Sequence, residues 1–377
     1  MKSKLLKNSN FLKKKKFQQT RKIYVVIGTR AQLIKMAPLM SLMQKEGLEY
    51  EFIYTAQHKE TISQILQNFN VKEPDRTLYS KSEANTKTKF FGWGLAMLLK
   101  AFNPTKVFPE KGIVLTHGDT ATTAWAAVVA KLARCKVFYV EAGLRTHRIL
   151  HPFPEELSRV ITSHFSDVYF CQDELAINNL KKYKGEKINT GSNTVYDSVI
   201  HALNSDVTVE IPNEPYVVVS IHRFQTIYSR KLEYVVIPLL EEVAQKGFTL
   251  LFVLHPSTRE VLKRNNSKLY KRLDNNNKII LKERYPYFEF VKLLNKSEFV
   301  ITDGGSNQEE LSYLGKPSLL IKAEMGRIEG INENAVMSYF DSKISMDFVK
   351  NYKKYQKPFK KIADSPCKII VDILKKI

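Results

Sequence analysis

The chain has 377 residues, of which 44% are hydrophobic, and a formal net charge of +21. This length exceeds the roughly 250 to 300 residues at which single hydrophobic cores stop growing, so two domains are expected rather than one. Nine of the positive charges lie in residues 1–22, which leaves a net charge of +12 for residues 23–377.

The first 22 residues contain no acid and no apolar stretch long enough for a signal peptide. We expect a disordered or loosely helical extension that stays in solvent, as blocks of like charge usually do. Contact with an anionic membrane surface or with nucleic acid is the alternative, without specific recognition of a nucleic acid.

Short apolar runs alternate with helix-length segments, which is the pattern of parallel strands buried on both faces. Six expected strands precede the middle of the chain, at residues 23–27, 51–55, 113–117, 137–140, 168–171 and 187–190. Five more follow, at residues 216–221, 249–254, 278–281, 299–302 and 318–321. The fold class is therefore α/β, with two Rossmann-like, doubly wound parallel-sheet domains that face a central cleft.

Domain boundaries follow from composition. Residues 204–215 are polar, contain two prolines and have no helical period, which indicates a linker between domains at 23–203 and 216–377. The last helix could pack back on the first domain.

The longest apolar stretch, residues 90–99, is about half of the roughly 20 residues that span a bilayer. We expect it to pack into the first domain as a helix, with attachment to a membrane surface as the alternative.

Carboxylates follow two of the expected strands. Asp119 comes after the run IVLTH, Glu141 comes after VFYV, and Glu155 follows in PFPEE. Acids just past parallel strands face the crevice at the carboxyl edge of the sheet. Three of them in one segment indicate either proton transfer or cation binding.

Anion-binding groups follow other strands. Arg30 offers a guanidinium, and Gly304, Gly305 and Ser306 precede a helix whose free amides stabilise phosphate oxygens. Glu310 and its neighbour Glu309 are candidates to accept hydrogen bonds from a ribose, although acids are also favoured in a first helical turn. Neither GxGxxG after the first strand nor a P-loop is present, so a nucleotide sugar is the best candidate ligand.

The order of these motifs resembles the non-hydrolysing UDP-N-acetylglucosamine 2-epimerases, bacterial enzymes of the GT-B fold. The resemblance runs from Lys22 onward and rests on GTRAQLIKMAPLM, YTAQH, LTHGDTATT, VEAGLRT, PFPEE, TGSNTVYD, SIHR, LHPS and ITDGGSNQEELSYLGKP. It implies interconversion of UDP-GlcNAc and UDP-ManNAc, or of a related UDP-HexNAc, for surface polysaccharide precursors. UDP elimination would give 2-acetamidoglucal, and UDP would then add back.

The resemblance also implies roles for individual residues. The acid/base set is Asp119, Glu141 and Glu155, with the first two as the proton-transfer pair, and His222 assists the leaving group. UDP is held by Arg30, Lys35, Gly304, Gly305, Ser306 and Glu310. Sugar or regulatory contacts fall on Gln57, His58 and Arg145. No metal and no cofactor are implied, and a homodimer is expected from the resemblance alone.

The chain departs from the family pattern at several positions. Gln32 and Gln225 stand where the family has glutamate, and Thr226 replaces an asparagine. Glutamine keeps the shape of glutamate but cannot ionise. The loop Gly304-Gly305-Ser306 replaces Ser-Gly-Gly, and Ala56 replaces a glycine. These changes affect the surroundings of the substrate rather than the three carboxylates.

Two other functions stay open. A hydrolysing epimerase would add water to the intermediate and release free ManNAc, and a GT-B glycosyltransferase or nucleotide-sugar binder would not need three acids.

The three cysteines, at positions 135, 171 and 367, are widely spaced without a CxxC pair. This spacing predicts neither a disulfide nor structural zinc, and it favours a cytoplasmic location.

Overall fold

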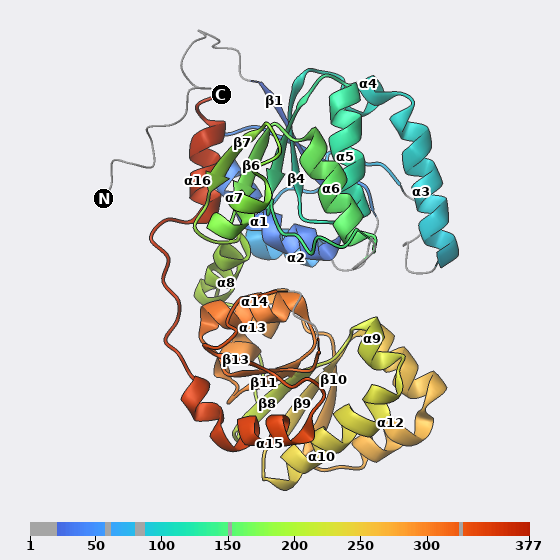
Figure 1. Ribbon diagram of the computed structural model, residues 1–377, viewed down its shortest axis with the longest axis vertical. Coiled ribbons are helices and arrows are strands. Elements are labelled where there is room, and N and C mark those ends of the chain that lie inside the picture. The colour runs from blue at the N-terminus through green and yellow to red at the C-terminus, as the bar shows by residue number, and fades with distance from the viewer. Residues whose placement is uncertain (1–20, 57–61, 80–86, 150–152, 324–326) are drawn as a thin grey trace. The chain divides into compact units, whose positions relative to one another are not determined.

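The computed structural model describes residues 21–56, 62–79, 87–149, 153–323 and 327–377. The chain divides into two compact units, each built on a parallel sheet (Figure 1). The first unit holds the residues up to Asp197 together with Ile362–Ile377, and the second holds Ser198–Lys361. The chain therefore passes between the units twice.

The first unit contains a seven-stranded sheet in the order β3-β2-β1-β4-β5-β6-β7. Its strands are β1 (Lys22–Ile27), β2 (Glu51–Tyr54), β3 (Arg76–Thr77), β4 (Gly112–His117), β5 (Lys136–Val140), β6 (Val168–Cys171) and β7 (Glu186–Asn189). All the neighbouring pairs are parallel, and the central strands β1 and β4 are almost wholly buried. The strand order reverses at β1 and β4, which is the topological switch point where ligands bind in open α/β sheets.

Helices connect these strands. They are α1 (Arg30–Lys45), α2 (Ile62–Phe69), α3 (Lys87–Ala101), α4 (Pro104–Val107), α5 (Ala121–Leu132), α6 (Glu155–Phe165) and α7 (Glu174–Asn179). Right-handed crossovers place α1 and α5 on opposite faces of the sheet, because the chain leaves β1 and β4 in opposite directions. Thr29 caps the beginning of α1 in a capping box. Its side chain accepts from the backbone amide of Gln32, and the Gln32 side chain accepts from the backbone amide of Thr29.

The second unit repeats the plan with six strands in the order β10-β9-β8-β11-β12-β13. The strands are β8 (Tyr216–Ser220), β9 (Thr249–Leu254), β10 (Ile279–Glu283), β11 (Val300–Thr302), β12 (Ser318–Leu320) and β13 (Ala335–Met337). The helical segments are α9 (Phe224–Ile227), η1 (Leu232–Val236), α10 (Ile237–Gln245), α11 (Pro256–Glu260), η2 (Val261–Asn265), α12 (Ser267–Asp274), α13 (Tyr287–Lys296), α14 (Gly305–Leu314), α15 (Ser342–Asn351) and η3 (Tyr352–Tyr355). The switch point here lies between β8 and β11.

The C-terminal helix α16 (Pro366–Leu374) belongs to the first unit and contacts α1 (Figure 1). Ser365 caps it, and Pro366 occupies its first position, where no backbone donor is needed. The carboxylate of Asp197, on α8 (Val195–Asn204), accepts from the backbone amide of Cys367 at 3.0 Å. This bond joins the two places at which the chain leaves and re-enters the unit.

The expected fold class is confirmed: both units are doubly wound parallel sheets. Each of the eleven expected strands is present within one or two residues, and the short strands β3 and β13 were not expected. The expected linker was residues 204–215; Asn204 ends α8, and no helix or strand occurs in residues 205–215. The domain limits drawn from the sequence stay a prediction, because compact units need not be independently folding domains.

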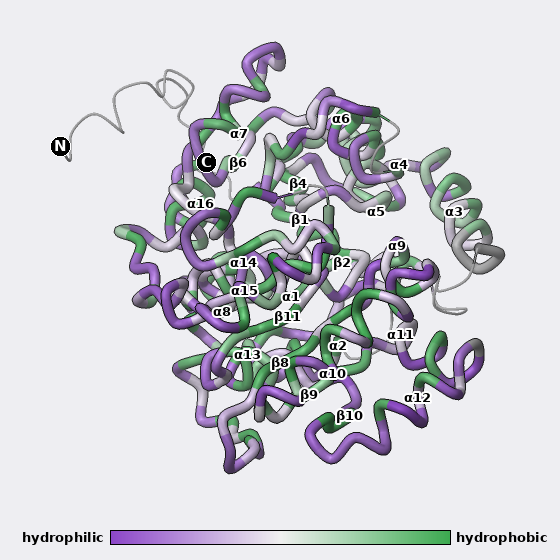
Figure 2. The backbone as a smooth tube through the Cα atoms, turned by 60° about the horizontal axis from the view of Figure 1, so that its bottom comes forward, coloured by the Kyte–Doolittle hydropathy of each residue, from purple (hydrophilic) through white to green (hydrophobic). Residues whose placement is uncertain are grey.

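Helix α3 contains the apolar stretch at residues 90–99, and it is only half packed. Trp93 and Met97 are buried, whereas Phe91, Leu98 and Phe102 are 74%, 55% and 78% exposed. The expectation of a helix packed into the domain is therefore correct for one face and wrong for the other. Hydrophobic residues recur along the helix (Figure 2). None of the helices in the described ranges combines the length and hydrophobicity needed to cross a bilayer.

Candidate active site

The carboxyl edge of the first sheet gathers the expected acids. β4 ends at His117 and leads through Gly118 to Asp119, and β5, its neighbour, ends at Val140 and leads to Glu141. Gly118 has φ 68°, the left-handed conformation that glycine adopts without strain. Glu141 also has a left-handed backbone, at φ 60°, which is uncommon for a residue with a side chain. Uncommon backbone of this kind is concentrated at functional sites.

Glu141 lies among buried polar groups. Its Oε2 is 2.6 Å from Lys35 Nζ and 3.0 Å from His117 Nε2, and all three side chains are nearly inaccessible. A neighbouring ammonium group favours the ionised form of a carboxyl. The structure thus places Lys35, expected to hold UDP, directly against one of the acid/base candidates.

Asp119 belongs to a second charged group. Its Oδ2 accepts from Nη2 and Nε of Arg159 at 2.6 and 3.1 Å. Arg159 also donates to Glu156, a fully buried carboxylate that accepts from Arg145 Nε at 2.6 Å. Burial acts to raise the pKa of Glu156, but Arg145, the backbone amide of Thr146 and Arg159 together hold it below its ordinary value. Arg145 and Arg159 therefore hold the carboxylates of Glu156 and Asp119 in place by ion pairs.

Glu155 begins α6, next to the buried Glu156. One of its oxygens, Oε2, is buried and has no hydrogen-bond partner among the residues that the structure describes. An unsatisfied buried oxygen costs free energy, so such oxygens are rare in native proteins and a catalytic role is one explanation for them. Arg145, expected as a sugar contact, pairs with Glu156.

Glu141 and the motif TGSNT line a common small hollow of about 10 Å³, the space of a single water molecule. Gln172, Ser192, Asn193 and Thr194 form much of its wall. Residues far apart in sequence thus meet around Glu141.

Gln32 explains one departure from the family pattern. Its Oε1 accepts from the backbone amides of Gly28 and Thr29, and its Nε2 donates to the His117 carbonyl at 2.7 Å and to Thr123 Oγ1 at 2.9 Å. An ionised glutamate could make the first two bonds but could not donate the others. Glutamine at this position therefore ties α1 to the end of β4.

The switch point of the second unit holds His222. Asp303, fully buried after β11, accepts from the backbone amides of His222 and Arg223 at 2.9 Å each. The His222 ring stacks on His255, with the ring centres 5.4 Å apart. Burial lowers the pKa of His222, Asp303 opposes this shift, and Arg223 and Arg284 add to it. At neutral pH the ring is therefore uncharged and can donate one hydrogen bond.

The beginning of α14 is surrounded by cations. A Cβ atom at Gly304 would lie 2.6 Å from His222 Cε1, so a side chain there would displace the imidazole. At Gly305 a Cβ atom would lie 3.3 Å from Arg327 Nε and 3.4 Å from Arg223 Nη2. Lys322 is buried nearby and donates to Gln308 Oε1. Three cations and free helix amides can stabilise a bound anion, and we call this cluster, with Ser306 exposed beside it, the anion site.

The tandem acids on α14 point inward. Glu309 is fully buried and pairs with Arg327, while Glu310 accepts from Asn307 Nδ2 at 3.1 Å. Gln308 Nε2 donates to the carbonyls of Arg327 and Glu329 at 3.1 and 2.8 Å. These bonds hold the Arg327 segment against the helix.

Some expected residues contribute less. Gln57 and His58 lie outside the described residues. Arg30, the first residue of α1, is buried at the switch point of the first sheet. Ala56 keeps the left-handed backbone, with φ 55°, that accounts for a glycine in the family pattern.

Within the described ranges, no three His, Cys, Asp or Glu side chains are grouped so as to hold a metal ion. The three cysteines are unpaired and buried.

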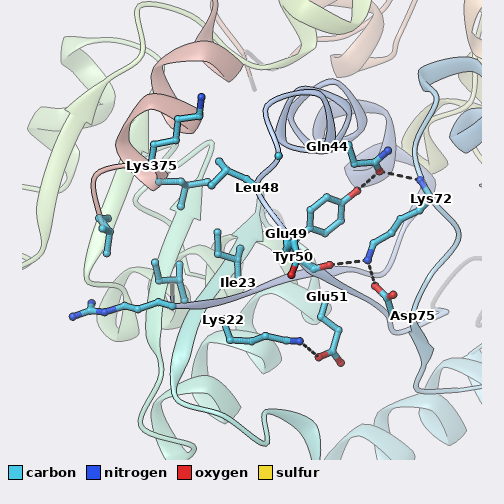
Figure 3. A pocket seen from close by; sticks show the side chains of 15 residues that line it. Lys22, Ile23, Gln44, Leu48, Glu49, Tyr50, Glu51, Lys72, Asp75 and Lys375 are labelled. Atoms are coloured by element: carbon cyan, nitrogen blue, oxygen red, sulfur yellow. Dashed lines mark hydrogen bonds and ion pairs between the residues drawn. The ribbon is translucent and has the colours of Figure 1, made fainter. Parts of the chain in front are cut away.

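A larger hollow of about 860 Å³ lies at the opposite edge of the first sheet, where β1, β2 and β4 begin (Figure 3). Its polar groups pair with one another: Lys72 contacts Asp75 and the Tyr50 carbonyl, and Lys22 lies 3.7 Å from Glu51. None of the expected site residues lines it. The hollow is therefore separate from the candidate active site.

Sequence reasoning missed several residues of these clusters. Arg159 had a detectable signal, because it follows Glu155 and Glu156 at the spacing that places side chains on one helical face. His117 was hidden inside an expected strand. Lys322 is brought to the anion site only by the tertiary fold.

Two Rossmann-like, doubly wound parallel-sheet units are the architecture of the GT-B class of α/β proteins. The sequence model of the family described as UDP-N-acetylglucosamine 2-epimerase matches residues 40–363. The chain therefore belongs to the UDP-N-acetylglucosamine 2-epimerase family and is an isomerase. The resemblance expected from the motifs is confirmed.

Individual relatives agree. A UDP-N-acetylglucosamine 2-epimerase from Campylobacter jejuni is 30% identical over 94% of this chain and 97% of its own length. The crystal structure of UDP-GlcNAc 2-epimerase from Neisseria meningitidis bound to UDP-GlcNAc has a TM-score of 0.79 and 26% identity, covering 94% of this chain and all of that chain. The crystal structure of the Methanocaldococcus jannaschii UDP-GlcNAc 2-epimerase in complex with UDP-GlcNAc and UDP has a TM-score of 0.79 and 25% identity, covering 94% of this chain and 99% of that chain.

Proposed function

We propose that the protein interconverts UDP-GlcNAc and UDP-ManNAc, or a related UDP-HexNAc pair, without net hydrolysis. The observation that carries this proposal is the pair of differently supported carboxylates at one sheet edge: Glu141 beside Lys35 and His117, and Asp119 beside Arg159. Carboxylates in different environments can act as base and acid in one reaction.

The chemistry balances with UDP as the only leaving group. A carboxylate takes the proton from C2 of the sugar, the C1–oxygen bond breaks, and the electron pair departs with UDP, leaving 2-acetamidoglucal. UDP then adds back at C1 while a carboxylic acid delivers a proton to the opposite face of C2. Asp119 and Glu141 are the proton-transfer pair, and Glu155 orients one of them or shares its proton.

The second unit binds and stabilises the diphosphate. Arg223, Lys322 and Arg327 at the beginning of α14 offset its charge, and the uncharged His222 donates to the departing oxygen. Arg30 and Lys35, at the switch point of the first sheet, are further candidates to bind UDP. The relatives with bound UDP-GlcNAc support this choice of ligand.

Product analysis tests the proposal. The purified protein is incubated with UDP-GlcNAc, and the mixture is followed by chromatography and NMR. We expect UDP-ManNAc to accumulate to a constant ratio without free sugar. Stoichiometric release of free ManNAc and UDP would instead establish the hydrolysing alternative. Absence of any product from UDP-GlcNAc and related UDP-HexNAc sugars would leave the binder or glycosyltransferase and refute both epimerase hypotheses.

We further propose that the protein forms a homodimer through the outer face of α3. The exposed residues Phe91, Leu95 and Leu98 of α3, and Phe102 directly after its end, are spaced by four, three and four positions, which is the spacing of a helix-pair seam. The residues beside this seam, Gly92, Gly94, Leu99 and Ala101, carry no charge, so two identical helices would not repel each other. A second copy of α3 therefore fits this face.

The cytoplasmic location and a role in surface polysaccharide synthesis stay predictions.

A further inference from the structure

His117 is a buried histidine with an unusual set of contacts. It ends β4, is 3% exposed, and its Nε2 lies 3.0 Å from Glu141 Oε2. Neither ring nitrogen makes a hydrogen bond within the described ranges, although Nε2 lies at this short distance from the carboxylate. Burying an imidazole in this way costs free energy that an apolar side chain of similar size would avoid. A packing role alone therefore does not explain the histidine.

The backbone of His117 is held firmly. Its carbonyl accepts from Thr123 Oγ1 at 2.6 Å and from Gln32 Nε2 at 2.7 Å, so α5 and α1 both fix the end of β4. The ring consequently extends from a rigid support toward Glu141, which lies just past the neighbouring strand β5.

Lys35 and His117 approach the same oxygen of Glu141 but supply different things. The lysine ammonium is a charge on a flexible stem with three rotatable donors, which favours ionisation but specifies direction weakly. An imidazole is planar and donates along one direction, so it can fix the orientation of the carboxylate. Glu141 also has a left-handed backbone, a conformation that persists where the surrounding structure holds it in place.

We propose that His117 is a positioning residue for the C2 proton transfer: its Nε2–H donates to Glu141 Oε2 and holds the carboxylate in the orientation that reacts. This inference rests on the proposed function, in which Glu141 is one of the proton-transfer pair. His117 itself does not touch the sugar.

The test uses a matched pair of variants in the full chain, His117→Gln and His117→Asn. The glutamine amide reaches about as far as Nε2, whereas the asparagine amide is one methylene shorter. Deuterium incorporation at C2 of UDP-GlcNAc in heavy water gives kcat and KM, calorimetry gives UDP affinity, and thermal unfolding gives Tm. We expect His117→Asn to lower kcat about tenfold to a hundredfold, with KM and UDP affinity unchanged. His117→Gln should recover most of kcat.

Two results would overturn the inference. His117→Asn could retain the wild-type kcat, or both variants could lose kcat, UDP affinity and Tm together, as a packing residue would. Wild-type protein is measured first, so that absence of exchange in the wild type refutes the proposed function itself and the inference with it. If the variants do not fold, nitrogen-15 NMR of wild-type His117 decides: a protonated Nε2 supports the inference, and an unprotonated Nε2 refutes it.

Discussion

Lys322 shows how burial adjusts one residue of the anion site. The side chain is 5% exposed and lies among other cations. Burial, followed by the charges of Arg223 and Arg327, lowers the pKa of Lys322 to about 8, against the opposing effects of Glu329 and Asp303. The amine therefore exchanges its proton near neutral pH. A bound diphosphate would favour the charged form and raise the pKa.

We predict that UDP binding takes up a proton at Lys322. With the pKa at about 8, roughly half of the amines are neutral at pH 8 and become charged when UDP binds, so uptake should be about half a proton per UDP. Uptake should vanish near pH 6, where the amine is already charged. Calorimetry at pH 8 in buffers of different ionisation enthalpy measures it. Lys322→Met is the control, and equal uptake by that variant would contradict the assignment.

The candidate residues differ in how well sequence predicts them. Asp119 and Glu141 were identifiable because each follows an apolar run, and the ends of parallel strands meet at one edge. Their partners Arg159 and His117 were not identified. The Arg159–Asp119 ion pair spans 40 positions and depends on the packing of α6 against the sheet, and the His117–Glu141 contact depends on the pairing of β4 with β5. Local pattern thus predicts where chemistry occurs, whereas tertiary packing decides how each group is supported.

At the scale of elements, buried strands were more predictable than short ones. β1 and β4 are continuous apolar runs, so their sequences alone indicate burial on both faces. β3 has two residues, which is too short for a period to develop. β13 has three residues, as β11 and β12 do, but unlike them it is not buried throughout, because Val336 at its centre is only half-buried. The outer face of α3 was also missed, because an apolar helix in sequence looks the same whether its second face is covered or exposed.

The exposed face of α3 gives a prediction for assembly. Leu98→Asp should weaken self-association at least tenfold, because each subunit would bury a charge at the seam. Sedimentation velocity across a range of concentrations measures the effect. Leu132→Asp is the matched control, since Leu132 is an equally exposed leucine (59%) on α5 of the same unit. Equal behaviour of the two variants, or a monomeric wild type, would contradict the proposed interface.

At the scale of the whole molecule, the first unit depends on both ends of the chain. Ile370, Val371 and Leu374 of α16 are buried, and the helix contacts α1. Burial of each such side chain stabilises by about 1.5–3 kcal/mol. The helix therefore completes the core of the first unit, although 164 residues of the second unit separate it from the rest of that unit.

We predict that ending the chain at Lys361 destabilises the first unit selectively. Hydrogen exchange should accelerate in β1 and α1, while the sheet of the second unit keeps its protection. Removal of residues 375–377 alone is the control and should have little effect, because α16 ends at Leu374. Uniform loss of protection in both sheets would show that the units do not unfold separately.

The central claim is that Asp119 and Glu141 transfer protons at C2 of a UDP-sugar. The most direct measurement is NMR of UDP-GlcNAc in heavy water with wild-type protein, Asp119→Asn and Glu141→Gln, alongside UDP affinity by calorimetry. We predict deuterium at C2 of both epimers with wild-type protein. Each variant should slow exchange at least about a thousandfold, while UDP affinity stays within about twofold. Turnover without deuterium at C2, or exchange retained by both variants, would contradict the account.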